Sequence, residues 1–386
     1  MIIEKVKKLI SDRPTYIRID LDNILENYKN IQKKSGNKKV LAVVKSDAYG
    51  LGAKIIAEYL YENGVNYFAV ATLEEAIELR TVVPKSLILV LGIINIKNIN
   101  HAIVNNISIT CPSVNWLVSA ISEVKNSNGT LKIHLKIDSG MSRIGIINER
   151  EAKVINDLIC KNNNIYLEGI FTHLSNADGI DSFYDNYQYK KFLNIKSFIK
   201  KIPEYTHIEN SAAILKRTIN NKEINICRAG IALFGQYPSN IVKEKTDVVL
   251  KNVSSLVSEV VHVKKVPNNT YVGYGCKYKT DDNEYIATVP IGYRDGVLRR
   301  ASGFSVSINN KFYKIIGNIC MDQLMIKCDK DVKVGDKVLF FGEYGDQKIN
   351  MFDFAEFQNT ISYEILCIIG SRVPRKYFIN DKEVKV

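Results

Sequence analysis

The chain has 386 residues, of which 46% are hydrophobic and 24% charged, the composition of a globular protein long enough for two domains. Its formal net charge is +12, but the lysines occur in short pairs with acids between them, which indicates a solvated surface more than a basic stripe for nucleic acid. The seven cysteines are spread singly, so we expect reduced thiols and no disulfide or metal site.

The N-terminal segment, residues 1–14, mixes charged residues with apolar ones and lacks the hydrophobic stretch of a signal peptide. The longest apolar run, residues 87–94, is too short to cross a bilayer. We therefore expect a cytoplasmic protein with no membrane or nucleic-acid partner.

Between residue 15 and about residue 227, short apolar runs alternate with segments of helical period, the pattern of a parallel α/β fold. The expected strands are 15–20, 40–44, 67–70, 87–91, 107–110, 131–137, 165–171, 205–208 and 224–226. The expected helices are 21–31, 53–63, 73–82, 113–125, 148–161, 181–201 and 211–219. Eight strand–helix repeats close a (β/α)8 TIM-type barrel, so one strand is surplus, and we expect residues 15–20 to join another domain.

From residue 246 to residue 386 the pattern changes to strands without long helices. The expected strands are 254–263, 285–289, 304–308, 314–316, 324–328 and 337–341, with one helix at 351–357. The sequence therefore predicts an α/β plus β architecture: an N-terminal barrel over residues 15–245 and a C-terminal mainly β domain over residues 246–386.

Lys45 follows the apolar run 40–44 and precedes a tight turn, Tyr-Gly-Leu-Gly. A lysine held at the end of a buried strand loses its proton more easily and becomes a nucleophile towards an aldehyde such as that of pyridoxal phosphate. The alternative is a lysine that only extends from the strand end to water.

Two further strand ends carry candidate functional side chains. Arg143 follows a glycine-bearing turn after the fifth barrel strand, where it is a fixed cation for an anionic group or part of an ordinary turn. His173 follows the sixth strand, and the alternative is again a structural histidine.

The seventh and eighth barrel strands precede Asn210-Ser211 and Gly230-Ile231, at the loops where barrels bind phosphate. Arg228 ends the eighth strand and, being permanently protonated, would donate to a ring nitrogen. In the β domain, Tyr274 stands between two glycines, and Tyr293 lies in a similar segment; both are also common in turns.

Read together, these segments resemble the pyridoxal-phosphate-dependent alanine racemases over almost the whole chain. The matching segments, in order, are AVVKSDAYGLG, KIDSGMSRIG, FTHLSNAD, ENSAA, CRAGIALFG, VGYG, VPIGYRDG, ICMDQ and ISYE followed by RVPRKY. The resemblance implies the barrel plus β domain, a homodimer with shared active sites, pyridoxal 5'-phosphate as cofactor, and D-alanine supply for peptidoglycan of the cell wall.

The resemblance also implies the catalytic pair. Lys45 would hold the cofactor covalently and act as the acid–base group on the D face, and Tyr274 of the partner subunit would be the base on the L face. Two groups are needed because racemisation removes a proton from one face and returns one to the other. His173 and Arg228 would lie next to this tyrosine and enable it to act as a base.

The same resemblance assigns the remaining site residues. Arg228 would meet the pyridine nitrogen, and Arg143 would contact the cofactor phenolate and the substrate carboxylate. Lys136 matches a lysine that is often carbamylated, and Met321 one whose backbone N–H touches the substrate. The phosphate shell would comprise Tyr49, Ser211, Gly230, Ile231 and Tyr363, and Asn210 would be a further cofactor-binding residue. The substrate access channel would comprise Asp178, Tyr293, Arg299 and Asp322.

Asn318 departs from the family pattern, because many members carry arginine there. Tyr363 favours alanine over serine as the substrate. A serine or broad-specificity racemase on the same scaffold stays open as an alternative. A decarboxylase of the same barrel class would not need Tyr274 opposite Lys45, and a non-catalytic carrier of the cofactor would leave the β domain unexplained.

Overall fold

The computed structural model describes residues 13–36, 38–125, 129–216 and 221–384. The chain divides into two compact units, one formed by residues 23–251 and the other by residues before 23 together with those from 252 onwards. Most of the expected N-terminal segment 1–14 and the end of the expected helix 211–219 lie outside the described residues. Each unit is described by itself.

The first unit is a barrel of parallel strands. Its strands are β2 (Lys39–Val43), β3 (Tyr67–Val70), β4 (Leu87–Val90), β5 (Ser108–Cys111), β6 (Leu131–Lys136), β7 (Ile165–Phe171), β8 (Tyr205–His207) and β9 (Ile226–Ala229). They pair in the order β8-β7-β6-β5-β4-β3-β2-β9, and the backbone N–H of Arg228 in β9 donates to the carbonyl of Glu209 after β8 at 3.0 Å. The expected barrel is confirmed.

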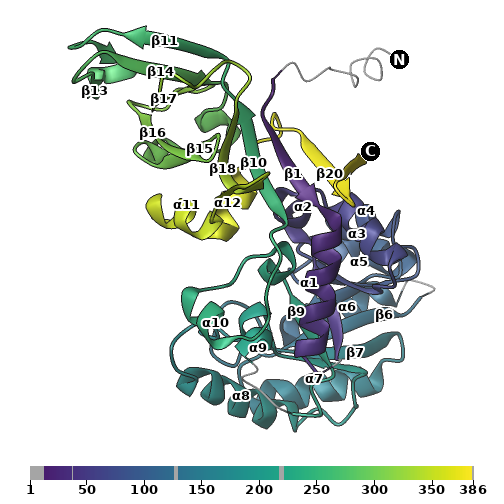
Figure 1. Ribbon diagram of the computed structural model, residues 1–386. Helices are drawn as coiled ribbons and strands as arrows, with labels where there is room; N and C mark the ends of the chain where they lie inside the picture. Colours follow the sequence, from purple (N-terminus) through teal and green to yellow (C-terminus); the bar gives the residue numbers. More distant parts are fainter. Residues whose placement is uncertain (1–12, 37, 126–128, 217–220, 385–386) are drawn as a thin grey trace, which may run out of the picture. The chain divides into compact units, whose positions relative to one another are not determined.

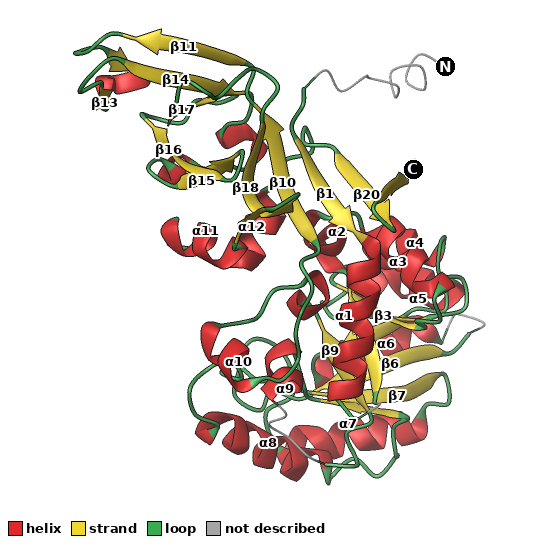
Figure 2. Cartoon of the chain, in the orientation of Figure 1, coloured by secondary structure: helices red, strands yellow, loops and turns green. Residues whose placement is uncertain are grey.

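Helices surround these strands, as Figures 1 and 2 show. They are α1 (Leu21–Lys34), α2 (Lys45–Gly50), α3 (Ala53–Glu62), α4 (Leu73–Arg80), η2 (Ile96–Asn98), α5 (Ile99–Val104), α6 (Val114–Val124), α7 (Glu149–Lys161), α8 (Phe183–Lys196), α9 (Ser211–Lys216), η3 (Ile231–Phe234) and α10 (Asn240–Lys245). The strands are apolar on both faces because helices cover one face and the barrel interior fills the other. Leu41, Ala69, Leu89 and Ile226, all fully buried, form one interior cluster.

The second unit is mainly β. Its strands are β1 (Tyr16–Asp20), β10 (Ser254–Glu259), β11 (His262–Val266), β12 (Tyr271–Val272), β13 (Tyr278–Lys279), β14 (Glu284–Val289), β15 (Ser305–Ile308), β16 (Lys311–Ile316), β17 (Leu324–Cys328), β18 (Lys337–Tyr344), β19 (Gln347–Ile349), β20 (Arg375–Ile379) and β21 (Lys382–Val384). Its helical segments are η4 (Tyr274–Cys276), η5 (Tyr293–Asp295), η6 (Arg299–Ala301), α11 (Met351–Phe357) and α12 (Ser362–Ile368). The main sheet runs β11-β14-β17-β16-β15-β18-β10-β1-β20-β21, with β19 on β18. In it β1 lies antiparallel to β10 and parallel to β20.

Three expectations about elements are wrong. The single strand expected over 254–263 is two strands, because Val260 bonds to the carbonyl of Asp336 and Val261 to that of Thr288, so the chain changes partner strands there. Only one helix was expected in the β domain, but α12 follows α11. The eighth barrel strand was expected over residues 224–226, with Arg228 at its end, whereas β9 runs from Ile226 to Ala229 and contains Arg228.

Asp295 is the charged centre of the β unit. Its fully buried carboxylate accepts hydrogen bonds from Arg13 at 2.9 and 2.7 Å, from Arg372 at 3.2 Å and from the backbone of Gly292 at 3.0 Å. Burial acts to raise the pKa of Asp295, but the bonds from Arg13 and Gly292 and the charges of both arginines outweigh it and lower the pKa. The charged carboxylate therefore stabilises the fold at pH values above 3.8, the ordinary pKa of an aspartate.

Asp295→Asn should lower the free energy of unfolding by about 1–3 kcal/mol at pH 7, because the arginines lose a buried charged acceptor. This loss of stability should shrink as the pH falls below about 4, because the wild-type Asp295 then takes up a proton when the protein unfolds. Urea unfolding at a series of pH values measures both effects. Asp322→Asn, which removes an exposed partner of Arg372 (2.8 Å), is the control and should change stability by less than about 1 kcal/mol. An equal effect of both substitutions would contradict this account.

Candidate active site at the barrel mouth

Lys45 directly precedes a turn of left-handed helix. The strand β2 ends at Val43, and Ser46, Asp47, Ala48 and Tyr49 all have φ between 52° and 58°. L-residues avoid this conformation at a cost of roughly 1–2 kcal/mol each, so a run of four is a marked local strain. The turn is nevertheless hydrogen-bonded, since Ala48 N–H donates to the carbonyl of Val44 at 2.9 Å. Such strain is typical of functional sites.

Tyr49, Ser211 and Gly230 meet in one corner of the mouth. Ser211 Oγ accepts the N–H groups of Gly230 at 2.9 Å and Ala232 at 3.4 Å. A Cβ at Gly230 would lie 2.6 Å from the Tyr49 hydroxyl oxygen, so only glycine allows this approach. The buried ring of Tyr49 packs on Phe234, with centroids 5.0 Å apart. Two hydroxyls and backbone N–H groups thus converge, which fits a phosphate group.

Asn210 and Ile231 flank this corner. Asn210 donates to the carbonyl of Leu174 at 3.2 Å and accepts the N–H of Ala213 at 3.1 Å, so its side chain fastens the loop after β8. Ile231 is buried at the start of η3.

Arg228 donates hydrogen bonds to four acceptors in the barrel unit. Its Nη1 donates to Nδ1 of His207 at 2.7 Å, and its Nη2 donates to the carbonyls of Thr172 and Ile208 at 2.8 Å each and to Nδ1 of His173 at 3.3 Å. Burial lowers the pKa of Arg228 to about 10, which leaves it charged at neutral pH. Burial, followed by the charges of Arg228, Arg143 and other cations, holds the pKa of His173 well below its usual value. Of this pair, only the arginine carries a charge.

A chain of hydrogen bonds continues from Arg228 into the barrel. Because the guanidinium only donates, His207 must accept at Nδ1 and donate from Nε2 to His134 Nδ1 at 2.9 Å, and His134 donates to Glu168 at 3.1 Å. Burial acts to raise the pKa of Glu168, but bonds from His134 and Ser108 and the charge of Lys132 outweigh it. Every hydrogen bond in this series is therefore donated in the same direction, from Arg228 towards the carboxylate of Glu168.

Lys136 lies beside these groups. Its buried amine donates to the carbonyl of Ile137 at 2.7 Å and stands 5.6 Å from the ring centroid of Phe171. Burial and then the charge of Arg228, with a further contribution from Arg143, lower the pKa of Lys136 to about 7 against a usual 10.5. Arg143 itself is exposed. Its turn is fixed by Asp138, which accepts the N–H groups of Gly140 and Ser142 at 3.0 Å each.

In the β unit, Tyr274 stands on a strained turn. Gly273 and Gly275 have φ of 77° and 72°, Cys276 has φ of 51°, and the tyrosine side chain is 73% exposed. The side-chain amide of Asn318 donates to the carbonyl of Tyr274 at 2.8 Å. Asn318 thus fastens this turn.

Of the other candidates in the β unit, Tyr293 and Met321 lie in neighbouring segments. The N–H groups of Tyr293 and Arg294 donate to the carbonyls of Cys320 and Met321 at 3.1 Å each, so the segments carrying Tyr293 and Met321 are paired. Met321 is exposed, and Asp322 next to it binds Arg372. Arg299 begins η6, Tyr363 is half-buried in α12, and Asp178 is exposed in the barrel unit after β7.

The structure thus brings Lys45, Tyr49, Lys136, Arg143, His173, Ser211, Arg228 and Gly230 to the mouth of the barrel. Sequence reasoning missed His134, His207 and Glu168. A signal was present, because Lys132, His134 and Lys136 occupy alternate positions of β6 and so share the face that points into the barrel.

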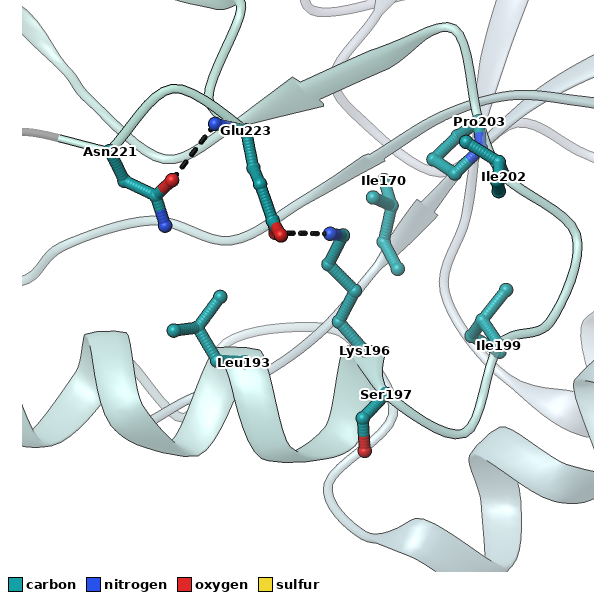
Figure 3. Close-up of a pocket in the computed structure, with 9 residues that line it drawn as sticks. All are labelled: Ile170, Leu193, Lys196, Ser197, Ile199, Ile202, Pro203, Asn221 and Glu223. Carbon is teal, nitrogen blue, oxygen red and sulfur yellow. Dashed lines mark hydrogen bonds and ion pairs between the residues drawn. The ribbon is translucent and has the colours of Figure 1, made fainter.

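A pocket on the barrel unit involves none of the predicted site residues (Figure 3). It is lined by Ile170, Leu193, Lys196, Ser197, Ile199, Ile202, Pro203, Asn221 and Glu223, and Lys196 donates to Glu223 across it at 2.8 Å. Within the described ranges, no helix is both long and apolar enough to cross a membrane.

A (β/α)8 barrel with a lysine, a buried arginine and a phosphate-binding corner at one end of its strands is the framework of an enzyme. Residues 19–238 match the alanine racemase N-terminal domain, and residues 253–377 match the alanine racemase C-terminal domain. The chain belongs to the alanine racemase family, whose members are isomerases.

Relatives cover almost the entire chain. It is 41% identical to the alanine racemase of Staphylococcus saprophyticus over 367 residues, 95% of each protein. A crystal structure of the alanine racemase from Bacillus anthracis with bound L-Ala-P is similar with a TM-score of 0.90 at 37% identity, over 97% of both chains. A histidine racemase from Leuconostoc mesenteroides is similar with a TM-score of 0.88 at 26% identity, over 95% of this chain and 99% of that one.

Lys136→Met should stabilise the protein at pH 7, because the unfolded lysine is charged below 10.5 while the folded one loses its proton near 7. The gain should be largest at and below pH 7 and vanish towards pH 10.5. Urea unfolding in bicarbonate-free buffer between pH 6 and 10 tests it, with exposed Lys54→Met as the control that shows no such gain. A gain independent of pH would refute the assignment of a displaced lysine proton.

Proposed function

We propose that this chain interconverts L- and D-alanine with pyridoxal 5'-phosphate as cofactor. The observation that carries the proposal is the single cluster of Lys45, Arg228 and the Tyr49–Ser211–Gly230 corner at the barrel mouth of a member of this family. These residues supply an amine, a permanent cation and anion donors, which are the groups that an aldehyde-bearing pyridine phosphate needs.

The cofactor would be held by these groups in three ways. Lys45 would bond to its aldehyde, Ser211 and the N–H of Gly230 would bind its phosphate together with Tyr49, and Arg228 would donate to its ring nitrogen. Ile231 and Tyr363 would complete the phosphate shell, and Asn210 would be a further cofactor-binding residue. When bound, the cofactor supplies an electron sink that acidifies the α-proton of the amino acid.

Two residues of the protein would carry the proton. The Lys45 amine would exchange it on the D face, and the Tyr274 hydroxyl of the partner subunit on the L face. Neutral His173 would stand next to Arg228 as the hydrogen-bond partner of that tyrosine, and the charge that favours its phenolate would come from Arg228.

Arg228 would also limit the reaction to racemisation. Its four acceptors keep it protonated and fixed, so it would donate a hydrogen bond to the ring nitrogen without giving up a proton. A ring that stays unprotonated draws less charge from the α-carbon, which disfavours transamination.

Arg143 would bind the substrate carboxylate, together with the backbone N–H of Met321 from the partner. Lys136 is the candidate for carbamylation, since a buried amine with a pKa near 7 is largely neutral above that pH and so is nucleophilic towards carbon dioxide. The resulting anion would orient Arg143, whereas the ammonium form would repel it.

Substrate would reach the site through a channel lined by Asp178, Tyr293, Arg299 and Asp322. Tyr363 favours alanine, because relatives acting on serine tend to lack tyrosine there. A broader racemase is the second candidate, since a histidine racemase has a similar fold. We infer a cytoplasmic homodimer with shared sites that supplies D-alanine for peptidoglycan.

A racemisation assay with pyridoxal phosphate over alanine, serine, histidine and basic amino acids tests the function. Alanine should react fastest, and Lys45→Ala should abolish the visible absorbance of the lysine-bound cofactor. Tyr274→Phe should keep that absorbance but lower turnover by about 10²–10⁴-fold, because one acid–base group is missing. Full turnover by Tyr274→Phe would sink the two-base scheme.

Mixing the two inactive variants tests the shared sites. After subunit exchange, a heterodimer of Lys45→Ala and Tyr274→Phe chains should contain about one intact site, because each site would take one residue from each chain. Activity should therefore return in the mixture but not in either variant alone. Exchange demonstrated by mass, without recovered activity, would place both residues of a site on one chain.

A further inference from the structure

Glu75 joins two segments through one carboxylate. It lies in α4, and its Oε1 accepts the N–H of Ser46 at 2.6 Å. Its Oε2 accepts the N–H groups of Ala71 at 2.7 Å and Thr72 at 3.3 Å. One side chain thus ties the start of helix α4 to the residue that directly follows Lys45.

Helix capping does not explain the hydrogen bond between Glu75 and the N–H of Ser46. Thr72 and Glu75 form a reciprocal capping box, in which Thr72 Oγ1 accepts the Glu75 N–H at 3.3 Å and Glu75 accepts the Thr72 N–H. That box needs only Oε2. The bond from Oε1 to Ser46 is an additional contact, and it is the shortest of the three bonds that the Glu75 carboxylate accepts.

Ser46 is the first residue of the left-handed turn, and nothing about its own burial holds it there. Ser46 and Asp47 are exposed, so packing does not fix them, and their backbone conformation is disfavoured. A second carboxylate belongs to the turn itself, because Asp47 Oδ1 accepts the N–H of Ala53, the first residue of α3, at 2.7 Å. Carboxylates therefore tie the turn both to α4 and to α3.

A carboxylate is required at residue 75 because both of its oxygens accept. A glutamine of the same shape has one oxygen and one NH2 group. Whichever way the amide is turned, its NH2 would face an N–H donor, either that of Ser46 or those of Ala71 and Thr72.

We propose that Glu75 is a positioning residue for Lys45, which fixes the lysine's orientation by holding Ser46 at the entrance to the left-handed turn. The proposal rests on the proposed function in that Lys45 is taken as the group that bonds to the cofactor. Glu75 touches neither cofactor nor substrate in this role.

The test compares four variants with the wild type: Glu75→Gln, Thr72→Ala, Ser46→Gly, and the double variant Ser46→Gly/Glu75→Gln. Thr72→Ala is the matched control, since it removes the other half of the capping box and leaves the bond to Ser46. Three properties are measured: thermal unfolding of the cofactor-free protein, hydrogen exchange of the peptide containing Ser46, and the dissociation constant of pyridoxal phosphate, with borohydride trapping at Lys45.

Glu75→Gln should speed exchange at Ser46 at least tenfold and weaken cofactor binding at least tenfold, while Thr72→Ala stays within twofold of the wild type in both. Both should lower the melting temperature similarly. Ser46→Gly should restore cofactor binding in the Glu75→Gln background, because glycine adopts the left-handed conformation without strain.

Equal weakening by Glu75→Gln and Thr72→Ala would show that Glu75 only caps the helix and would overturn the proposal. Unchanged exchange at Ser46 in Glu75→Gln would overturn it as well. Failure of the wild type itself to be trapped at Lys45 would instead refute the proposed function, and the exchange data would still report whether Glu75 holds the turn.

Discussion

The left-handed turn at residues 46–49 is the constraint on which the barrel mouth depends. At roughly 1–2 kcal/mol per residue, its four non-glycine residues together cost about 4–8 kcal/mol, a large part of the stability of an ordinary domain. The turn places two side chains at once. Lys45 stands at its start, and Tyr49, at its end, packs on Phe234 and reaches Gly230. A right-handed turn of the same length would send these side chains elsewhere.

The electrostatics of the mouth follow from a surplus of cations. The charges of Lys45, Lys136, Arg143 and Arg228 all act on His173, whereas Asp138 is occupied by its own loop. The protein relieves this repulsion by keeping histidines neutral and by displacing the proton of Lys136. Such a site binds an anion favourably, because the anion adds negative charge next to these cations. A phosphate-bearing cofactor with a carboxylate substrate has that character.

Periodicity and strand ends gave the barrel and the positions of Lys45, His173 and Arg228, because these depend on local sequence. They did not give the handedness of the turn, since Ser46 and Ala48 have no special preference for a positive φ. The N–H of Ser46 is bonded by Glu75, which is 29 residues away in the sequence. Nor did they give the chain from His207 to Glu168, because its bonds cross three strands. The break between β10 and β11 was missed for a similar reason, as it arises from a change of partner strand that the apolar run 254–263 does not reveal.

The position of β1 in the sequence affects the order in which the two units can fold during synthesis. Tyr16–Asp20 is synthesised long before its two partner strands, Ser254–Glu259 and Arg375–Ile379. At about 5–20 residues per second, the intervening synthesis takes tens of seconds. Residues 23–251 can complete their own strand pairing during that time, whereas the second unit cannot close its sheet until β20 has been synthesised. The barrel mouth is thus formed first, while β1 still lacks both of its partner strands.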